Sequence, residues 1–103
     1  MEYAIVRYGV KEERRAENRA LVEKVFDDLH RTVPDGLRYL VLELEDGEFV
    51  HLVAAEGETS PLPKLAAFRA FTESHEERRS TPVARKSARI VGAYRMLADG
   101  KQE

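Results

Sequence analysis

The stretch from Leu37 to Ala54, LRYLVLELEDGEFVHLVA, contains two runs of strand-forming residues separated by Asp46-Gly47. An Asp-Gly pair between two such runs is a strong hairpin signal, because a tight type I′ turn needs positive φ at both central residues. The sequence therefore predicts two antiparallel strands, over residues 37–45 and 48–54, joined by a two-residue turn.

Both faces of this predicted hairpin are largely apolar. With Asp46 and Gly47 as the turn, one face carries Leu40, Leu42, Leu44, Phe49, His51 and Val53. The opposite face carries Tyr39, Val41, Glu43, Val50, Leu52 and Ala54. A sheet with one face in water alternates apolar and polar residues more cleanly. We therefore expect helices to cover the first face and a second subunit to cover the other, so that His51 points toward the helices.

The residues on either side of the hairpin predict further elements. Residues 3–10 are rich in β-branched and aromatic types, which favours a strand. Residues 13–31 and 65–72 place their apolar side chains at helical spacing, which indicates two amphipathic helices. A last strand is predicted over residues 87–97, and residues 98–103 are expected to form a frayed tail.

The predicted order is thus β-α-β-β-α-β. Two βαβ halves with right-handed crossovers form a four-stranded antiparallel sheet with both helices on one face and strands one and three in the centre. This is an α+β, ferredoxin-like fold, and 103 residues suit a single domain over 1–103.

Composition excludes several classes of function. The chain has 17 Lys and Arg against 19 Asp and Glu, a net charge of −2, which provides no electrostatic case for nucleic-acid binding. It has no cysteine, so disulfides and thiolate chemistry are excluded. No apolar run is long enough for a membrane span or a signal peptide, so a cytoplasmic location is expected. The histidines share no metal-ligand spacing and no glycine-rich phosphate loop is present, so neither a metal nor another cofactor is predicted.

His51 is the main candidate for chemistry. It is predicted in the middle of a strand among apolar residues, where an imidazole needs a partner or a polar cavity. It is interpreted either as a catalytic general base or hydrogen-bond donor in a pocket, or as a structural histidine bonded to a backbone carbonyl or across a dimer interface. His30 and His75 lie near charged helix ends and are expected to be solvated.

Three further residues are candidate ligand contacts. Asn18 lies at the rim of the first helix's apolar stripe, where its amide could orient a ligand; the alternative is a surface or capping asparagine. Tyr94 and Phe68 are candidates to contact an apolar ligand, and packing in the core or at a dimer interface is the alternative for the strand tyrosines.

Several short patterns carry a resemblance to a known group of proteins. They are Asn18-x-x-Leu21-Val22-x-x-Val25-Phe26, Pro34-x-Gly36-Leu37-x-Tyr39, Phe49-Val50-His51, Phe68-x-x-Phe71 and Val91-Gly92-x-Tyr94. Across nearly the whole chain, this pattern resembles the dimeric α/β-barrel superfamily, near the antibiotic-biosynthesis monooxygenase family and its uncharacterised bacterial relatives.

The resemblance implies a homodimer formed through the sheets, and a cofactor-independent monooxygenase acting on a small aromatic or quinone-like molecule. The alternatives are a non-catalytic module that binds a small ligand and a purely structural homodimer of the same fold. Related oxygenases and haem-degrading enzymes commonly use a tryptophan with asparagine and histidine or arginine partners. This chain has no tryptophan, and Asn18 is its only asparagine, so that motif does not carry over whole.

Overall fold

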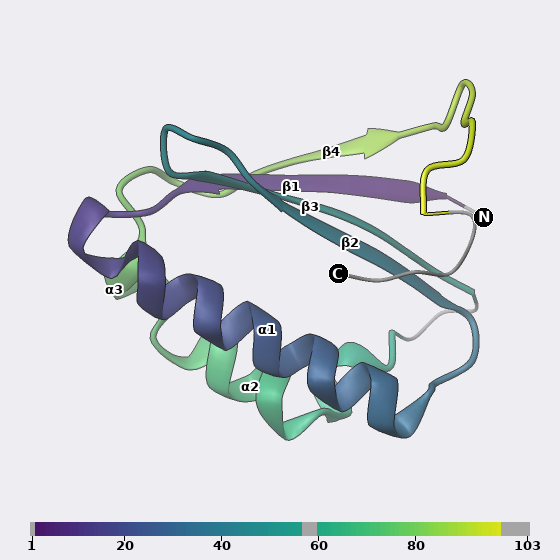
Figure 1. Cartoon of the computed structure of the whole chain (residues 1–103), viewed down its shortest axis with the longest axis horizontal. Coiled ribbons are helices and arrows are strands. Elements are labelled where there is room, and N and C mark those ends of the chain that lie inside the picture. Colours follow the sequence, from purple (N-terminus) through teal and green to yellow (C-terminus); the bar gives the residue numbers. More distant parts are fainter. Residues whose placement is uncertain (1, 57–59, 98–103) are drawn as a thin grey trace.

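The computed structural model describes residues 2–56 and 60–97, and its elements follow the predicted order (Figure 1). The main elements are β1 (Tyr3–Gly9), α1 (Arg15–Thr32), β2 (Leu37–Glu43), β3 (Glu48–Ala55), α2 (Ala66–Glu73) and β4 (Ala84–Ala88). Three short helices complete the chain: η1 (Glu12–Arg14), η2 (Leu62–Lys64) and α3 (His75–Arg78).

The four strands form one antiparallel sheet in the order β2-β3-β1-β4. The prediction that the first and third strands lie in the centre is confirmed. Helices α1 and α2 lie side by side on one face of the sheet, and the other face is left open (Figure 1). The fold is therefore α+β and ferredoxin-like, as predicted.

The predicted hairpin register is wrong by one residue. The N–H of Leu44 donates to the carbonyl of Glu48 at 2.8 Å, and the N–H of Gly47 donates to the carbonyl of Leu44 at 3.0 Å. The loop therefore has three residues and ends on Gly47, whose φ is 92°. Because this loop is one residue longer than the predicted two-residue turn, with a glycine of positive φ as its last residue, His51 pairs with Val41 instead of Leu42.

This one-residue shift exchanges the two faces of β2 relative to the prediction. The side chains that share the helix-facing side with His51 are those of Tyr39, Val41 and Glu43, whereas Leu40 and Leu42 lie on the open face. The predicted grouping of Leu40 and Leu42 with His51 is therefore wrong. The prediction that His51 itself faces the helices is confirmed, because its ring lies 5.7 Å from that of Phe71 in α2.

The last strand is displaced toward the N-terminus relative to the prediction. Strand β4 ends at Ala88, which pairs with Tyr3 at the very start of β1, so no neighbouring strand remains beyond that point. Arg95 and Leu97 also have positive φ, which is incompatible with a strand. The large apolar residues of the following segment are exposed: Ile90, Val91, Tyr94, Met96 and Leu97. The predicted tail, 98–103, lies outside the described residues.

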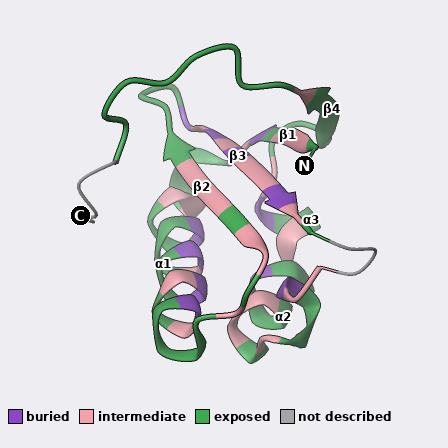
Figure 2. Ribbon diagram, turned by 90° about the vertical axis from the view of Figure 1, so that its right-hand side faces the viewer, coloured by how far each residue is buried: buried purple, intermediate pink, exposed green. Residues whose placement is uncertain are grey.

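The core fills the space between the sheet and the helix layer, where buried residues of strands and helices face one another (Figure 2). Its buried members are Tyr8, Val10, Val22, Val25, Leu29, Phe49, Leu62 and Phe71. The rings of Tyr8 and Phe49, which occupy opposite positions on β1 and β3, stack at 5.9 Å. Among the described residues, no helix is long and apolar enough to cross a membrane.

Candidate functional site

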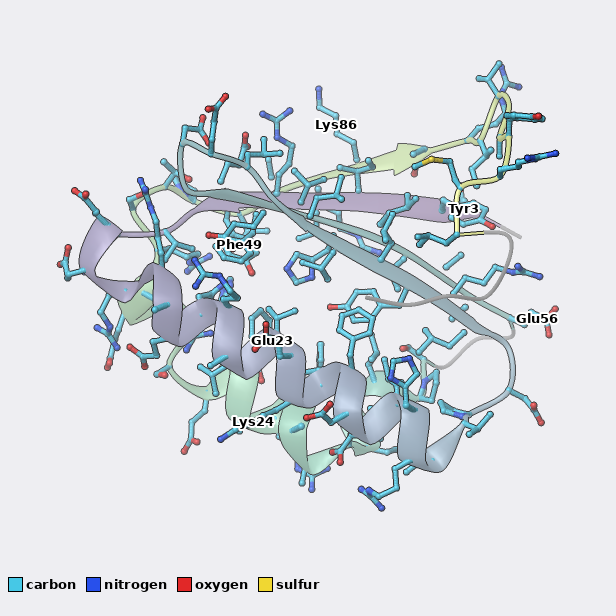
Figure 3. All side chains as sticks on the ribbon, in the orientation of Figure 1. Tyr3, Glu23, Lys24, Phe49, Glu56 and Lys86 are labelled. Carbon is cyan, nitrogen blue, oxygen red and sulfur yellow. The ribbon has the colours of Figure 1, made fainter. Side chains whose placement is uncertain are left out.

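The side chain of His51 lies at the centre of the helix-facing side of the sheet and is 5% exposed. Alternation along the strands brings Tyr8 of β1 and Tyr39 of β2 to the same side. Figure 3 shows this division of the sheet, since Phe49 points toward the helices and Lys86 points away from them. Three strands thus place three polar ring side chains side by side in an otherwise apolar layer.

Both ring nitrogens of His51 are hydrogen-bonded to tyrosines. Its Nε2 lies 2.8 Å from the hydroxyl of Tyr8, and its Nδ1 lies 2.8 Å from the hydroxyl of Tyr39. Burial, and to a smaller extent the nearby His75, lowers the pKa of His51 to about 4. The imidazole is therefore neutral near neutral pH, with one nitrogen donating and the other accepting. Burial also raises the pKa of both tyrosines, that of Tyr8 to about 12.

Asn18 lies behind this group and is completely buried. Its Nδ2 lies 3.3 Å from the hydroxyl of Tyr8, and its Oδ1 lies 2.8 Å from Nε of Arg78. The expected alternative of a surface or capping asparagine is therefore wrong. The residue does not line the cavity described below, so any influence on a ligand passes through Tyr8.

Arg78 is the least expected member of the site. It belongs to a basic stretch of the sequence with Arg79, Arg85, Lys86 and Arg89, where solvated side chains are expected, but the structure buries it completely. Its guanidinium donates to Oδ1 of Asn18, to Oγ of Ser74 at 2.9 Å and to the carbonyl of Phe71 at 2.6 Å. Within the described part of the chain, no carboxylate forms a salt bridge with it. Burial lowers the pKa of Arg78.

A cavity of about 720 Å³ opens beside His51, between the sheet and the segment formed by η2 and α2. This volume is in the range of known small-molecule sites. The residues of its wall that matter here are Tyr39, His51, Phe68, Phe71 and His75, and Arg85 lies with them on the β4 side. Phe68, one of the candidate ligand contacts, therefore lines this cavity, and its contact with a ligand stays a prediction.

His75 forms part of the same wall and is not the solvated residue that was expected. Its ring meets the ring of Tyr8 edge-on at 4.3 Å, and its buried Nε2 has no hydrogen-bond partner among the described residues. Burial, followed by the charges of Arg78 and Arg79, lowers the pKa of His75 to about 4. The sequence did contain a pattern that places His75 beside the two phenylalanines, because Phe68, Phe71 and His75 follow helical spacing.

Tyr94 does not join this group. It is 78% exposed in the segment after β4 and is absent from the cavity wall. A second cavity of about 830 Å³ lies along α1 and β2, but its polar lining includes the surface residues Glu23, Asp27 and Glu43 and it lacks His51. Among the described residues, no three histidine or acidic side chains converge as a metal site.

Comparison with known proteins finds similarity in structure only. No protein-family model matches the chain, and no curated protein matches it. A Nitrosomonas europaea protein provisionally named an antibiotic biosynthesis monooxygenase superimposes with a TM-score of 0.69 at 14% identity, covering 87% of this chain and 89% of that one.

Two further solved structures have the same architecture. An antibiotic biosynthesis monooxygenase matches with a TM-score of 0.68 at 15% identity, over 89% of this chain and 100% of its own. A conserved protein from Methanosarcina mazei matches with a TM-score of 0.67 at 15% identity, over 85% of this chain and 90% of its own. The resemblance seen in the sequence is thereby confirmed at the level of the fold: the chain has the ferredoxin-like fold of the antibiotic biosynthesis monooxygenase-like proteins.

Proposed function

We propose that the cavity beside His51 binds a small aromatic molecule with phenol or quinone oxygens, and that the protein oxidises it with O2 as a cofactor-independent monooxygenase. The observation that carries this proposal is the composition of the cavity wall. It combines two phenylalanine rings with the partly buried, hydrogen-bonded pair of Tyr39 and His51, and with a nitrogen of His75 that is buried and has no hydrogen-bond partner among the described residues. The fold shared with monooxygenase-like proteins adds support by analogy.

Each part of the wall has a role toward such a molecule. Phe68 and Phe71, whose ring centroids lie 6.0 Å apart, offer faces and edges to an aromatic ring. Tyr39 offers a hydroxyl to a ring oxygen, and His51 holds that hydroxyl in place. We assign to His75, whose imidazole is neutral near neutral pH, the role of the general base that accepts the proton of the phenol.

The reaction balances without a further reductant. A 1,4-hydroquinone and one O2 yield a hydroxyquinone and one water, so one oxygen atom forms a new C–O bond and the other leaves in water. The substrate loses four electrons and O2 gains four. Removal of the phenolic proton by His75 makes the ring electron-rich enough to react with O2, and Tyr39 stabilises the oxygen on which negative charge develops.

A non-catalytic binding protein is the second candidate, and one observation favours it. Both nitrogens of His51 are occupied by tyrosines, so the residue first suspected as a base has no free lone pair for a substrate. In that case the same cavity would bind the aromatic molecule without oxidising it.

Dimerisation through the open face of the sheet completes the proposal. This face carries apolar side chains on three strands: Ile5, Leu40, Leu42, Val50 and Leu52. Leu42 is half exposed in the single chain, and the segment after β4 exposes further apolar residues. A surface of this kind is unusual on a monomer, and a second copy of the chain is the occupant that the fold analogy favours.

The enzymatic proposal is tested with 1,4-dihydroxynaphthalene as the probe substrate. The expected product is a hydroxynaphthoquinone, detected by its mass, without hydrogen peroxide. Simple autoxidation instead yields naphthoquinone and hydrogen peroxide. His75→Gln should slow the enzymatic product at least about 10-fold, the lower part of the range for a general base. The matched control is His30→Gln, which changes an exposed histidine of α1 and should leave the rate unchanged. A wild-type rate equal to that of buffer overturns the enzymatic proposal, and binding of the probe without turnover supports the non-catalytic one.

A further inference from the structure

We propose that Arg78 sets the direction of a buried hydrogen-bond chain, formed by Arg78, Asn18, Tyr8, His51 and Tyr39, so that Tyr39 presents its hydroxyl hydrogen to a ligand oxygen in the cavity. The proposal that the ligand carries such an oxygen rests on the proposed function. The direction of the chain does not, because it is a property of the protein alone.

The first link is determined by the chemistry of arginine. A guanidinium only donates hydrogen bonds, so the atom of Asn18 that lies 2.8 Å from Nε of Arg78 must be the amide oxygen. The amide nitrogen of Asn18 then faces Tyr8 and donates to its hydroxyl oxygen. The orientation of an asparagine amide is often ambiguous, but here the buried cation leaves one choice.

The second link follows from the burial of Tyr8, which is 2% exposed. Its oxygen accepts from Asn18, so its own hydrogen needs an acceptor. Among the described residues the partner at hydrogen-bond distance is Nε2 of His51, at 2.8 Å. An unsatisfied buried hydroxyl hydrogen would cost about 1–3 kcal/mol. Tyr8 therefore donates to His51, and Nε2 is the accepting nitrogen.

The third link is the hydrogen bond between His51 and Tyr39, at the wall of the cavity. A neutral imidazole that accepts at Nε2 carries its hydrogen on Nδ1. The Nδ1–H of His51 therefore donates to the hydroxyl oxygen of Tyr39, 2.8 Å away. The hydrogen of Tyr39 has no acceptor among the described residues, and Tyr39 lines the cavity. The chain thus ends in a hydrogen-bond donor directed at whatever occupies the cavity.

This direction selects a class of ligand. The end of the chain recognises an accepting oxygen, such as a quinone carbonyl or a phenolate. Each donor in the series is polarised by the one behind it, and the series begins at a buried positive charge, so the preference is for an oxygen that carries or develops negative charge. Arg78 is a positioning residue in this scheme, since it acts on the ligand only through the other four side chains.

The direct test is the tautomer of His51 in the ligand-free protein, measured by the 15N chemical shifts of its ring nitrogens. The expected result is a protonated Nδ1 and an unprotonated Nε2. The opposite tautomer in the wild-type protein overturns the proposal, and this measurement requires no variant to fold.

Asn18→Asp is designed to reverse the chain with almost no change of shape. The carboxylate still pairs with Arg78, but it accepts from Tyr8 where the amide donated. Tyr8 must then accept from His51, whose hydrogen moves to Nε2, and Tyr39 must donate to Nδ1 instead of the ligand. Transfer of the hydrogen to Nε2 in Asn18→Asp supports the proposal. An unchanged tautomer in the folded variant contradicts it.

Binding of 1,4-naphthoquinone adds a functional measurement, with naphthalene as the control that lacks accepting oxygens. Tyr39→Phe and Asn18→Asp should each weaken naphthoquinone binding about 5- to 10-fold, the effect of one lost hydrogen bond. Neither variant should change naphthalene binding more than about twofold. Equal weakening for both probes overturns the role of Tyr39 as the donor. If naphthoquinone does not bind, the proposed ligand class is wrong, and the tautomer result still decides the direction of the chain.

Discussion

Nε of Arg78 lies 2.8 Å from Oδ1 of Asn18, and both side chains are completely buried although 60 residues separate them in the sequence. This bond joins the short helix α3 to α1 and places a cation in the interior without a carboxylate partner in the described part of the chain. The charge is instead satisfied by three neutral acceptors and the face of the Phe71 ring, 5.2 Å away.

Replacing Arg78 by methionine should therefore destabilise the fold strongly. The apolar side chain fills a similar volume but leaves the amide oxygen of Asn18 and the carbonyl of Phe71 without their donors. A loss of about 3 kcal/mol in the free energy of unfolding is expected, because each buried acceptor left without its donor costs about 1–3 kcal/mol. Urea denaturation measures it. The control Arg89→Met, at an exposed position, should stay within about 0.5 kcal/mol. A loss below about 1 kcal/mol for Arg78→Met would contradict the burial of this charge.

Two histidines with lowered pKa values, the buried His51 and the partly buried His75, predict a loss of stability in mild acid. Burial lowers the pKa of His51 and of His75 to about 4, below the value of about 6.5 in an unfolded chain. Below pH 6.5 the unfolded chain therefore binds protons that the folded chain does not, so stability falls as the pH falls toward 4. For His51 alone the loss between neutral pH and pH 5 is about 2 kcal/mol.

Urea denaturation at pH 7.5 and at pH 5 checks this dependence. His75→Gln removes one of the two groups, so its loss of stability between the two pH values should be smaller than that of the wild type. His30→Gln, at an exposed site, should retain the wild-type dependence. Equal stability of the wild type at both pH values would show that the surroundings of these histidines do not lower their pKa values.

The three-residue hairpin loop predicts that Gly47 is costly to replace. Its φ is 92°, which L-residues rarely adopt, and a Cβ at this position would also force the guanidinium of Arg15 to move aside. We expect Gly47→Ala to destabilise the protein by about 1–2 kcal/mol. Gly92→Ala is the matched control, because a Cβ there meets nothing within 4 Å. Thermal unfolding of the two variants provides the comparison, and equal melting temperatures would contradict the loop and with it the register of His51.

The proposed dimer predicts a molar mass of twice 11.8 kDa in light scattering at micromolar concentration. Leu42→Glu places a charge on the open face of the sheet and should produce the monomer. Val33→Glu, at an apolar residue that is 71% exposed at the end of α1, should leave the mass unchanged. A monomeric wild-type protein would refute dimerisation, and a dimer that survives Leu42→Glu would argue for another interface.

Periodicity was sufficient to predict the order of the strands and long helices, because their apolar spacings are regular. It could not predict the loop length, since Asp46-Gly47 suits both a two-residue turn and a three-residue loop with a bulge. Strand β4 ends at Ala88 because its pairing partner β1 begins at Tyr3, and the local sequence around Ala88 does not contain this information. His51 could be predicted as a candidate site residue because a histidine is unusual in an apolar strand. Arg78 was missed because its burial depends on acceptors supplied by a helix far away in the sequence.

The cavity beside His51 is proposed as the binding site for a small aromatic molecule with accepting oxygens. Titration of the 15N-labelled protein with 1,4-naphthoquinone, followed by the chemical shifts of its amides and histidine rings, tests it most directly. We expect saturable shifts that concentrate at Tyr39, His51, Phe71 and His75 and that become weaker in Tyr39→Phe. Shifts confined to the open face of the sheet, or no saturable shifts at all, would contradict it.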